Sequence, residues 1–160
     1  MVRQAFIAMT VVVSVGAAAA WTAAQSKDLF IGTWEVNIAK SKYSPGPAPK
    51  SSTVVFEAAG SGYKITVKQV GAKGDPQNWS FTTNLDGTPS VLLGNNPNSD
   101  ISTYTRVDAH TLAAVATKNG KETTRTRLVV SPDGKTRTNT VIGVDPAGQQ
   151  INNVIVLDRK

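Results

Sequence analysis

The sequence predicts an all-β domain in which a single antiparallel up-and-down meander of about nine to ten strands closes into a barrel. From residue 53 onward, short runs rich in Val, Ile, Thr and aromatic residues alternate with segments rich in Gly, Pro, Asn and Asp. Beyond residue 24, no stretch carries apolar residues at helical spacing. Strands joined by short turns become antiparallel neighbours, and a sheet of this size must curl to hide its edges. A two-sheet β-sandwich is the alternative.

Residues 1–24 are typical of a secretory signal peptide. Arg3 gives a positive start, an alanine-rich apolar run covers residues 5–20, and small residues predict cleavage between Ala24 and Gln25. The alternative is an uncleaved anchor, although a membrane span needs about 20 strongly apolar residues. No cysteine is available for a lipoprotein anchor. We therefore expect an exported protein, periplasmic or extracellular.

Cleavage would remove 24 of the 160 residues and leave 136, residues 25–160, which is the size of one domain. Without cysteine, the domain must be held by sheet packing rather than by disulfides, and thiol chemistry is excluded. The formal charge of +6 falls by one, to +5, when Arg3 leaves. The basic residues are scattered rather than clustered, so we expect a solvated surface, no nucleic-acid partner and a monomer.

The first predicted strand and the segment after it differ sharply in character. Residues 32–38 alternate polar and apolar side chains, with Trp34, Val36 and Ile38 on one face. Three prolines and a glycine follow within residues 45–49, a composition that neither a helix interior nor a central strand accepts. The sequence therefore predicts a stiff strap between the first two strands.

The remaining strands follow at short intervals, separated by turn residues. Asp86-Gly87 and Asn119-Gly120 are hairpin dipeptides, because both tolerate positive φ. Pro132 and Gly134 fit a tight turn. A single helical turn within residues 26–31 is expected to cap one end of the barrel. The predicted strands cover residues 32–38, 53–57, 63–68, 78–83, 90–93, 101–107, 111–117, 122–130, 135–144 and 151–157.

Alternation also predicts which side chains point into the barrel. The inward set is apolar and aromatic, with threonines of the late strands on the same face. About ten strands enclose more space than these side chains fill, so an internal cavity is expected. The inward set comprises Trp34, Val36, Ile38, Val54, Phe56, Tyr63, Ile65, Val67, Trp79, Phe81, Leu112, Leu128, Val130, Ile142, Ile155 and Leu157, with Thr124, Thr126, Thr138 and Thr140.

The pair Gly32-x-Trp34 on the first strand of a meander resembles the calycin superfamily, which contains lipocalins and fatty-acid-binding proteins. The resemblance implies that Trp34 plugs one end of the barrel. The chain departs from fatty-acid-binding proteins in having the proline strap where they carry a helix pair. It also lacks their basic-aromatic pair in residues 151–157 and the C-terminal helix common in lipocalins. The fold analogy therefore brings no ligand with it.

A wider resemblance is to exported bacterial proteins described as uncharacterised or lipocalin-like. It covers most of the chain after residue 24 and implies no activity. The residues that carry it are Gly32-Thr33-Trp34, Lys40-Ser41-Lys42-Tyr43-Ser44-Pro45-Gly46-Pro47-Ala48-Pro49-Lys50, Ser131-Pro132-Asp133-Gly134-Lys135-Thr136 and Asn152-Asn153-Val154.

The sequence offers little for catalysis. Its single histidine, His110, lies beside Asp108 in a predicted turn, and no Gly-x-Ser-x-Gly elbow is present. One histidine and no cysteine argue against a zinc site, and Asp86, Asp133 and Asp145 belong to turns. We therefore expect no enzyme activity, no metal and no cofactor.

Two functions remain open. The first is a carrier of a small apolar or amphipathic ligand inside the barrel, with a pocket of several hundred Å3. The second is a non-catalytic envelope protein with a filled barrel, which meets its partners through a basic outer face. Candidate ligand contacts are cationic or aromatic residues of the strands and the strap, namely Tyr63, Trp79, Tyr104, Arg106, Lys42 and Tyr43.

Overall fold

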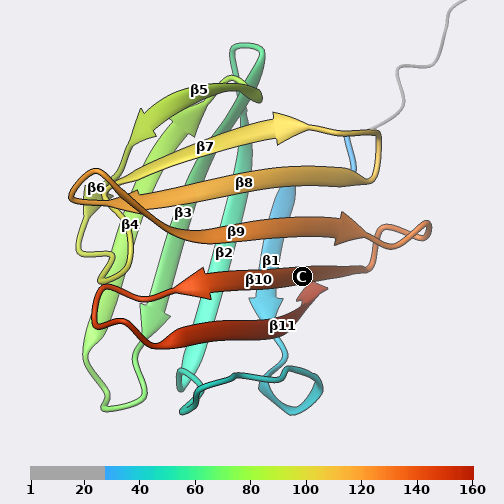
Figure 1. Ribbon diagram of the computed structural model, residues 1–160. Coiled ribbons are helices and arrows are strands. Elements are labelled where there is room, and N and C mark those ends of the chain that lie inside the picture. The colour runs from blue at the N-terminus through green and yellow to red at the C-terminus, as the bar shows by residue number, and fades with distance from the viewer. Residues whose placement is uncertain (1–27) are drawn as a thin grey trace, which may run out of the picture.

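The computed structural model describes residues 28–160 (Figure 1). The predicted signal peptide, residues 1–24, lies outside them, as does the start of the predicted domain 25–160. Within residues 28–160, no helix is long and apolar enough to cross a membrane. The strands are β1 (Gly32–Val36), β2 (Ser51–Ala59), β3 (Gly62–Val70), β4 (Pro76–Thr83), β5 (Asp86–Val91), β6 (Leu93–Gly94), β7 (Ile101–Arg106), β8 (Thr111–Lys118), β9 (Lys121–Val130), β10 (Thr136–Val144) and β11 (Gln150–Arg159), with a short 3-10 helix η1 (Ile38–Lys40).

The strands form one antiparallel sheet that curls into a nearly closed barrel. Their order is β5-β7-β8-β9-β10-β11-β1-β2-β3-β4-β6. β1 pairs with β2 on one side and with β11 on the other, since Trp34 lies opposite both Val54 and Arg159. Figure 1 shows β1–β4 behind the strands β7–β11. The predicted up-and-down barrel is confirmed, and its seam lies between β4 and β5.

The seam arises where the chain departs from the predicted hairpin at Asp86-Gly87. β4 pairs with β6, and β5 pairs with β7, so the strands before and after this turn are not hydrogen-bonded neighbours. Leu85 takes a left-handed conformation, with φ of 63°, and buries its side chain in the core. The turn is thus directed inward, and the predicted run 90–93 is divided between β5 and β6. The sheet has eleven strands instead of the predicted nine to ten.

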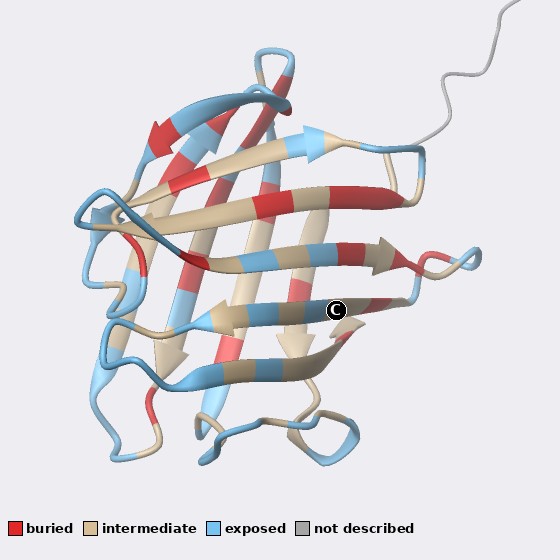
Figure 2. Ribbon diagram, in the orientation of Figure 1, coloured by how far each residue is buried: buried red, intermediate tan, exposed pale blue. Residues whose placement is uncertain are grey.

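The buried core lies toward one end of the barrel, which we call the closed end. Figure 2 shows β10 buried near its first residues, and Arg137 is its one buried residue. The closed end lies beside the turn between β9 and β10, where Val130, Arg137 and Leu157 face one another in register. The buried hydrophobic residues are Phe30, Trp34, Phe56, Tyr63, Ile65, Val67, Phe81, Leu85, Leu112, Ala114, Leu128, Val130 and Leu157.

The prediction that Ile142 points inward is wrong. Its side chain is 51% exposed and lies opposite Arg125 and Asn152 on the outer face. Arg137 is buried and lies opposite Val130, so strand alternation places Asn139 and Val141 on the inner face of β10. Thr138 and Thr140 therefore point outward as well. The inner face of β10 was misidentified because its apolar residues were assumed to point inward, whereas Arg137 and Asn139 do so.

Gly143→Ala should destabilise the barrel by about 2–4 kcal/mol, by adding backbone strain to an overpacked contact. Gly143 has φ of 152°, and a Cβ atom there would lie 2.0 Å from the carbonyl oxygen of Thr123 on β9. Urea unfolding measures the effect. The control is Gly46→Ala, because a Cβ atom at Gly46 would meet nothing within 4 Å. Equal unfolding midpoints for the two variants would contradict the prediction.

Candidate functional site

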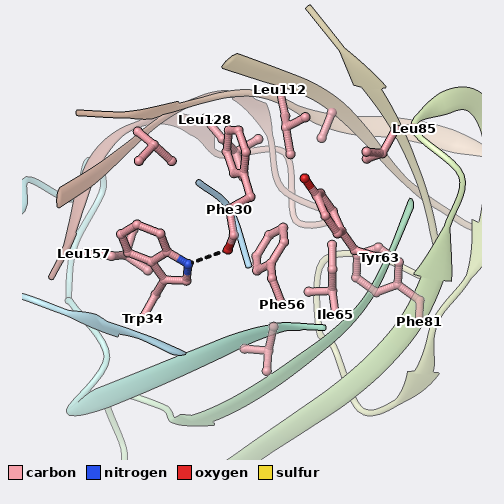
Figure 3. Close-up of a cluster of buried hydrophobic side chains, with 13 residues drawn as sticks. Phe30, Trp34, Phe56, Tyr63, Ile65, Phe81, Leu85, Leu112, Leu128 and Leu157 are labelled. Carbon is pink, nitrogen blue, oxygen red and sulfur yellow. Dashed lines mark hydrogen bonds between the residues drawn. The ribbon is translucent and has the colours of Figure 1, made fainter. Parts of the chain in front are cut away.

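Trp34 lies at the closed end and packs against the segment that precedes β1. Its ring is fully buried, and Nε1 donates a hydrogen bond of 2.9 Å to the carbonyl oxygen of Phe30 (Figure 3). The Arg159 guanidinium lies 4.2 Å from the Trp34 ring and donates to the carbonyl oxygens of Leu29, Ile31 and Gly134. A Cβ atom at position 32 would lie 2.5 Å from Arg159 Nη1, so the glycine leaves room for the arginine. We call this packed group, Phe30, Gly32, Trp34 and Arg159, the plug.

Tyr63 and Arg106, two of the candidate ligand contacts, are engaged at the same end. The Tyr63 hydroxyl donates to the Asp28 carboxylate, and Arg106 Nη2 donates to the same carboxylate at 2.7 Å. Burial, and then the Asp28 carboxylate, raise the pKa of Tyr63 well above its usual value, so the hydroxyl keeps its proton. The cluster fastens Asp28 to β3 and β7.

The other half of the barrel is open to solvent from within. Register places one inward-facing row across β9, β10 and β11, and each member is only half-buried. An outward-facing row on the same strands has the same degree of burial. Inward side chains would be buried if the interior were filled, so solvent reaches this half. The inward row is Thr126, Val141 and Asn153; the outward row is Val129, Thr138 and Val156.

Aromatic and aliphatic side chains form the opposite wall of this open half. Trp79 lies in register with Val67 of β3, which in turn lies opposite Val54 of β2, so the three share the inner face. Trp79 and Val54 are half-buried. Tyr104 of β7 packs against Phe81 with ring centroids 5.5 Å apart, and burial raises its pKa. We call the open half the basin and define it by Val54, Trp79, Tyr104, Thr126, Val141 and Asn153.

Arg137 lies between the plug and the basin, and the sequence analysis did not select it. Its side chain is 1% exposed, and its guanidinium lies 4.7 Å from the Phe56 ring and 5.1 Å from the Trp34 ring. Nε and Nη1 are buried without a hydrogen-bond partner. Burial, with a smaller effect from Arg159, lowers the pKa of Arg137 to about 9. The turn at residues 131–136 could have revealed Arg137 in the sequence. A hairpin across this turn places Arg137 opposite Val130, which was predicted to face inward.

The strap runs beside β11 before it turns toward β2. Lys42 forms an antiparallel bridge with Val154, with N···O distances of 2.7 and 2.9 Å. The Ser44 backbone N–H donates to Asn153 Oδ1 at 2.8 Å. Lys42 is exposed, whereas Tyr43 is half-buried and burial raises its pKa. The structure therefore does not gather the six predicted contacts into one site: Trp79 and Tyr104 line the basin, Tyr63 and Arg106 brace the closed end, and Lys42 and Tyr43 lie in the strap.

Two open clefts lie outside the barrel interior, and neither is an enclosed apolar chamber. One, of about 790 Å3, lies at the closed end between Asp28, Arg106 and His110. The other, of about 550 Å3, lies near the tips of β9–β11 beside Glu122 and Arg125. His110 lies in the turn between β7 and β8, where its Nδ1 is 3.1 Å from the Val130 carbonyl oxygen. Within residues 28–160, no group of three His, Cys, Asp or Glu residues is arranged to hold a metal ion.

Comparison with known proteins finds a structural likeness. No protein-family model matches the chain, and no curated protein matches it. Among solved structures, it is similar to zebrafish ileal bile acid-binding protein in complex with cholic acid, with a TM-score of 0.46 and 10% sequence identity. The match covers 82% of this chain and 99% of that chain.

Proposed function

We propose that the protein binds a small amphipathic molecule in the basin. The observation that carries the proposal is the inward row Thr126, Val141 and Asn153, whose members are only half-buried although they face the barrel interior. Barrel interiors that hold ligands keep such space among side chains that would otherwise pack together. The basin is open on one side, so a ligand would enter it without unfolding of a strand.

The lining of the basin supports an amphipathic ligand rather than a purely apolar one. Val54 and Trp79 offer an apolar wall on β2 and β4. Thr126 on β9 offers a hydroxyl group, and Asn153 on β11 offers its amide N–H groups, since its Oδ1 already accepts from Ser44. A molecule with one apolar face and a few polar groups would satisfy both walls, whereas a bare hydrocarbon would leave polar side chains without partners.

The wider setting is also part of the proposal. The signal-like residues 1–24 support export, and the proposed carrier is a lipocalin-like monomer that acts outside the cytoplasm. The absence of a nucleophile–base pair in the sequence supports binding rather than catalysis. The competing function is an envelope protein with no interior ligand, which would associate with its partners through surface lysines.

A pair of substitutions on β10 tests the basin. Val141→Trp would fill it from within, whereas Thr140→Trp would place the same side chain on the exposed outer face of the same strand. Titration of each folded variant with the neutral dye Nile red measures binding. We expect the first variant to bind at least about tenfold more weakly than the wild type and the second to stay within about twofold. Equal affinities for the two variants, or no binding by the wild type, would favour the envelope protein.

A further inference from the structure

Arg137 is a cation without a counter-ion in the described part of the chain. Residues 28–160 contain ion pairs between Lys40 and Asp158, Arg106 and Asp28, Arg125 and Glu122, and Lys160 and Glu35. Arg137 belongs to none of them. The groups that influence its charge are the Tyr104 phenol and the Arg159 guanidinium, which is itself a cation. A buried cation with no partner is strongly unfavourable unless something else compensates for the lost water.

The aromatic contacts compensate only in part. The attraction between a cation and an aromatic ring is weaker than the hydration that a guanidinium loses when it is buried. The rings also offer no lone pairs, so they do not satisfy the N–H groups of Nε and Nη1. The site therefore has two hydrogen-bond donors without an acceptor.

Asn139 adds an acceptor beside these donors. It is two residues beyond Arg137 on the inner face of β10, and its Oδ1 is buried without a partner. Val141, the next inward residue, belongs to the basin. Along β10 the interior therefore presents Arg137, Asn139 and Val141 in succession from the plug toward the opening. The first two form the floor of the basin.

We propose that Arg137 and Asn139 bind the head of the ligand, and that this head is an anionic group with a neighbouring hydroxyl. The inference rests on the proposed function of the basin. The anion would accept hydrogen bonds from Nε and Nη1, and the hydroxyl would donate to Asn139 Oδ1. A hydroxylated carboxylate has this combination of groups. Both nitrogens are covered by protein atoms, so the head must displace a side chain at the floor as it binds.

Displacement of Nile red by three probes of equal chain length tests the floor. Dodecanol is neutral, dodecanoate adds the anion, and α-hydroxydodecanoate adds the neighbouring hydroxyl. We expect wild-type protein to prefer dodecanoate to dodecanol by about tenfold, and α-hydroxydodecanoate to dodecanoate by about threefold. Arg137→Met should abolish the first preference, and Asn139→Leu should abolish the second.

Arg127→Met is the matched control, because Arg127 is an exposed arginine on the neighbouring strand β9. It should leave both preferences unchanged. An Arg137→Met variant that still prefers dodecanoate would overturn the anion site, and an Asn139→Leu variant that keeps the second preference would overturn the hydroxyl contact. Nile red binding separates the two proposals. If wild-type protein binds the dye but does not prefer the anion, only the proposed anion site is refuted. If it does not bind the dye, ligand binding in the basin is refuted.

Discussion

Replacing Trp34 with alanine should lower the free energy of unfolding by about 3–5 kcal/mol, the usual range for a buried tryptophan. The indole is fully buried, and its loss would also remove the hydrogen bond from Nε1 to the Phe30 carbonyl oxygen. The guanidinium groups of Arg137 and Arg159 would lose the ring that both contact. Urea unfolding followed by circular dichroism measures the change.

Trp79→Ala is the control for this experiment. Trp79 is half-buried in the basin and has no part in the plug, so we expect a loss of no more than about 1–2 kcal/mol. If both variants lost the same stability, the closed end would not be the centre of the core. A Trp34→Phe variant should fall between wild type and Trp34→Ala, because it keeps an aromatic ring but loses the Nε1 donor.

Arg137→Met should stabilise the ligand-free protein at neutral pH by about 1–4 kcal/mol, the range observed when a buried ion pair gives way to apolar side chains of similar volume. Methionine is flexible enough to fill the space between Trp34 and Phe56 without carrying a charge. The same variant is expected to lose the anion preference. Greater stability with weaker recognition would identify Arg137 as a residue kept for binding.

The difference in stability between Arg137→Met and wild type should depend on pH in one direction. Burial lowers the pKa of Arg137 to about 9 in the folded protein, well below the usual value for a guanidinium. Above about pH 9 the unfolded chain therefore binds more protons than the folded chain, and folding becomes more favourable as the pH rises. The cost of burying the charged Arg137 side chain is fully present below pH 9 and is relieved above it, where the folded protein holds the side chain neutral.

Unfolding of wild type and Arg137→Met at about pH 7 and about pH 10 measures this effect. We expect the stability advantage of the variant to shrink at the higher pH. Titration of lysines and tyrosines elsewhere acts on both proteins and cancels in the difference. An advantage that stayed constant or grew would show that burial of the Arg137 charge is not its cause.

The barrel could be predicted from local features of the sequence. Alternation over Trp34 and Val36, and the dipeptide Asn119-Gly120, specify a strand and a hairpin without reference to the rest of the chain. The partner of β5 could not be predicted in this way. It depends on Leu85, whose side chain enters the core and turns the chain away from β4, and such a choice is made by long-range packing.

For the candidate site too, local sequence identified some residues, whereas the role of others depends on partners far away in the chain. Trp79 and Tyr104 were selected as aromatic strand residues, and both line the basin. Tyr63 and Arg106 were selected on the same grounds, but their partner is Asp28, which lies 35 and 78 residues away in the chain. Arg137 was missed because a charged residue was assumed to face solvent. Only the pairing across the β9–β10 turn reveals that it points inward.

The plug also constrains the order in which the protein can fold. Arg159 closes over Trp34 through a hydrogen bond to Ile31, a residue 128 positions earlier in the chain. β1 completes its pairing only with β11, so closing the barrel requires a loop that spans nearly all of the described sequence. Contacts of such long sequence separation make folding slow, because the loop entropy is lost before the contact forms. During synthesis Trp34 is made long before the last strand and stays uncovered until that strand exists, so the native core can form only after nearly the whole chain is complete.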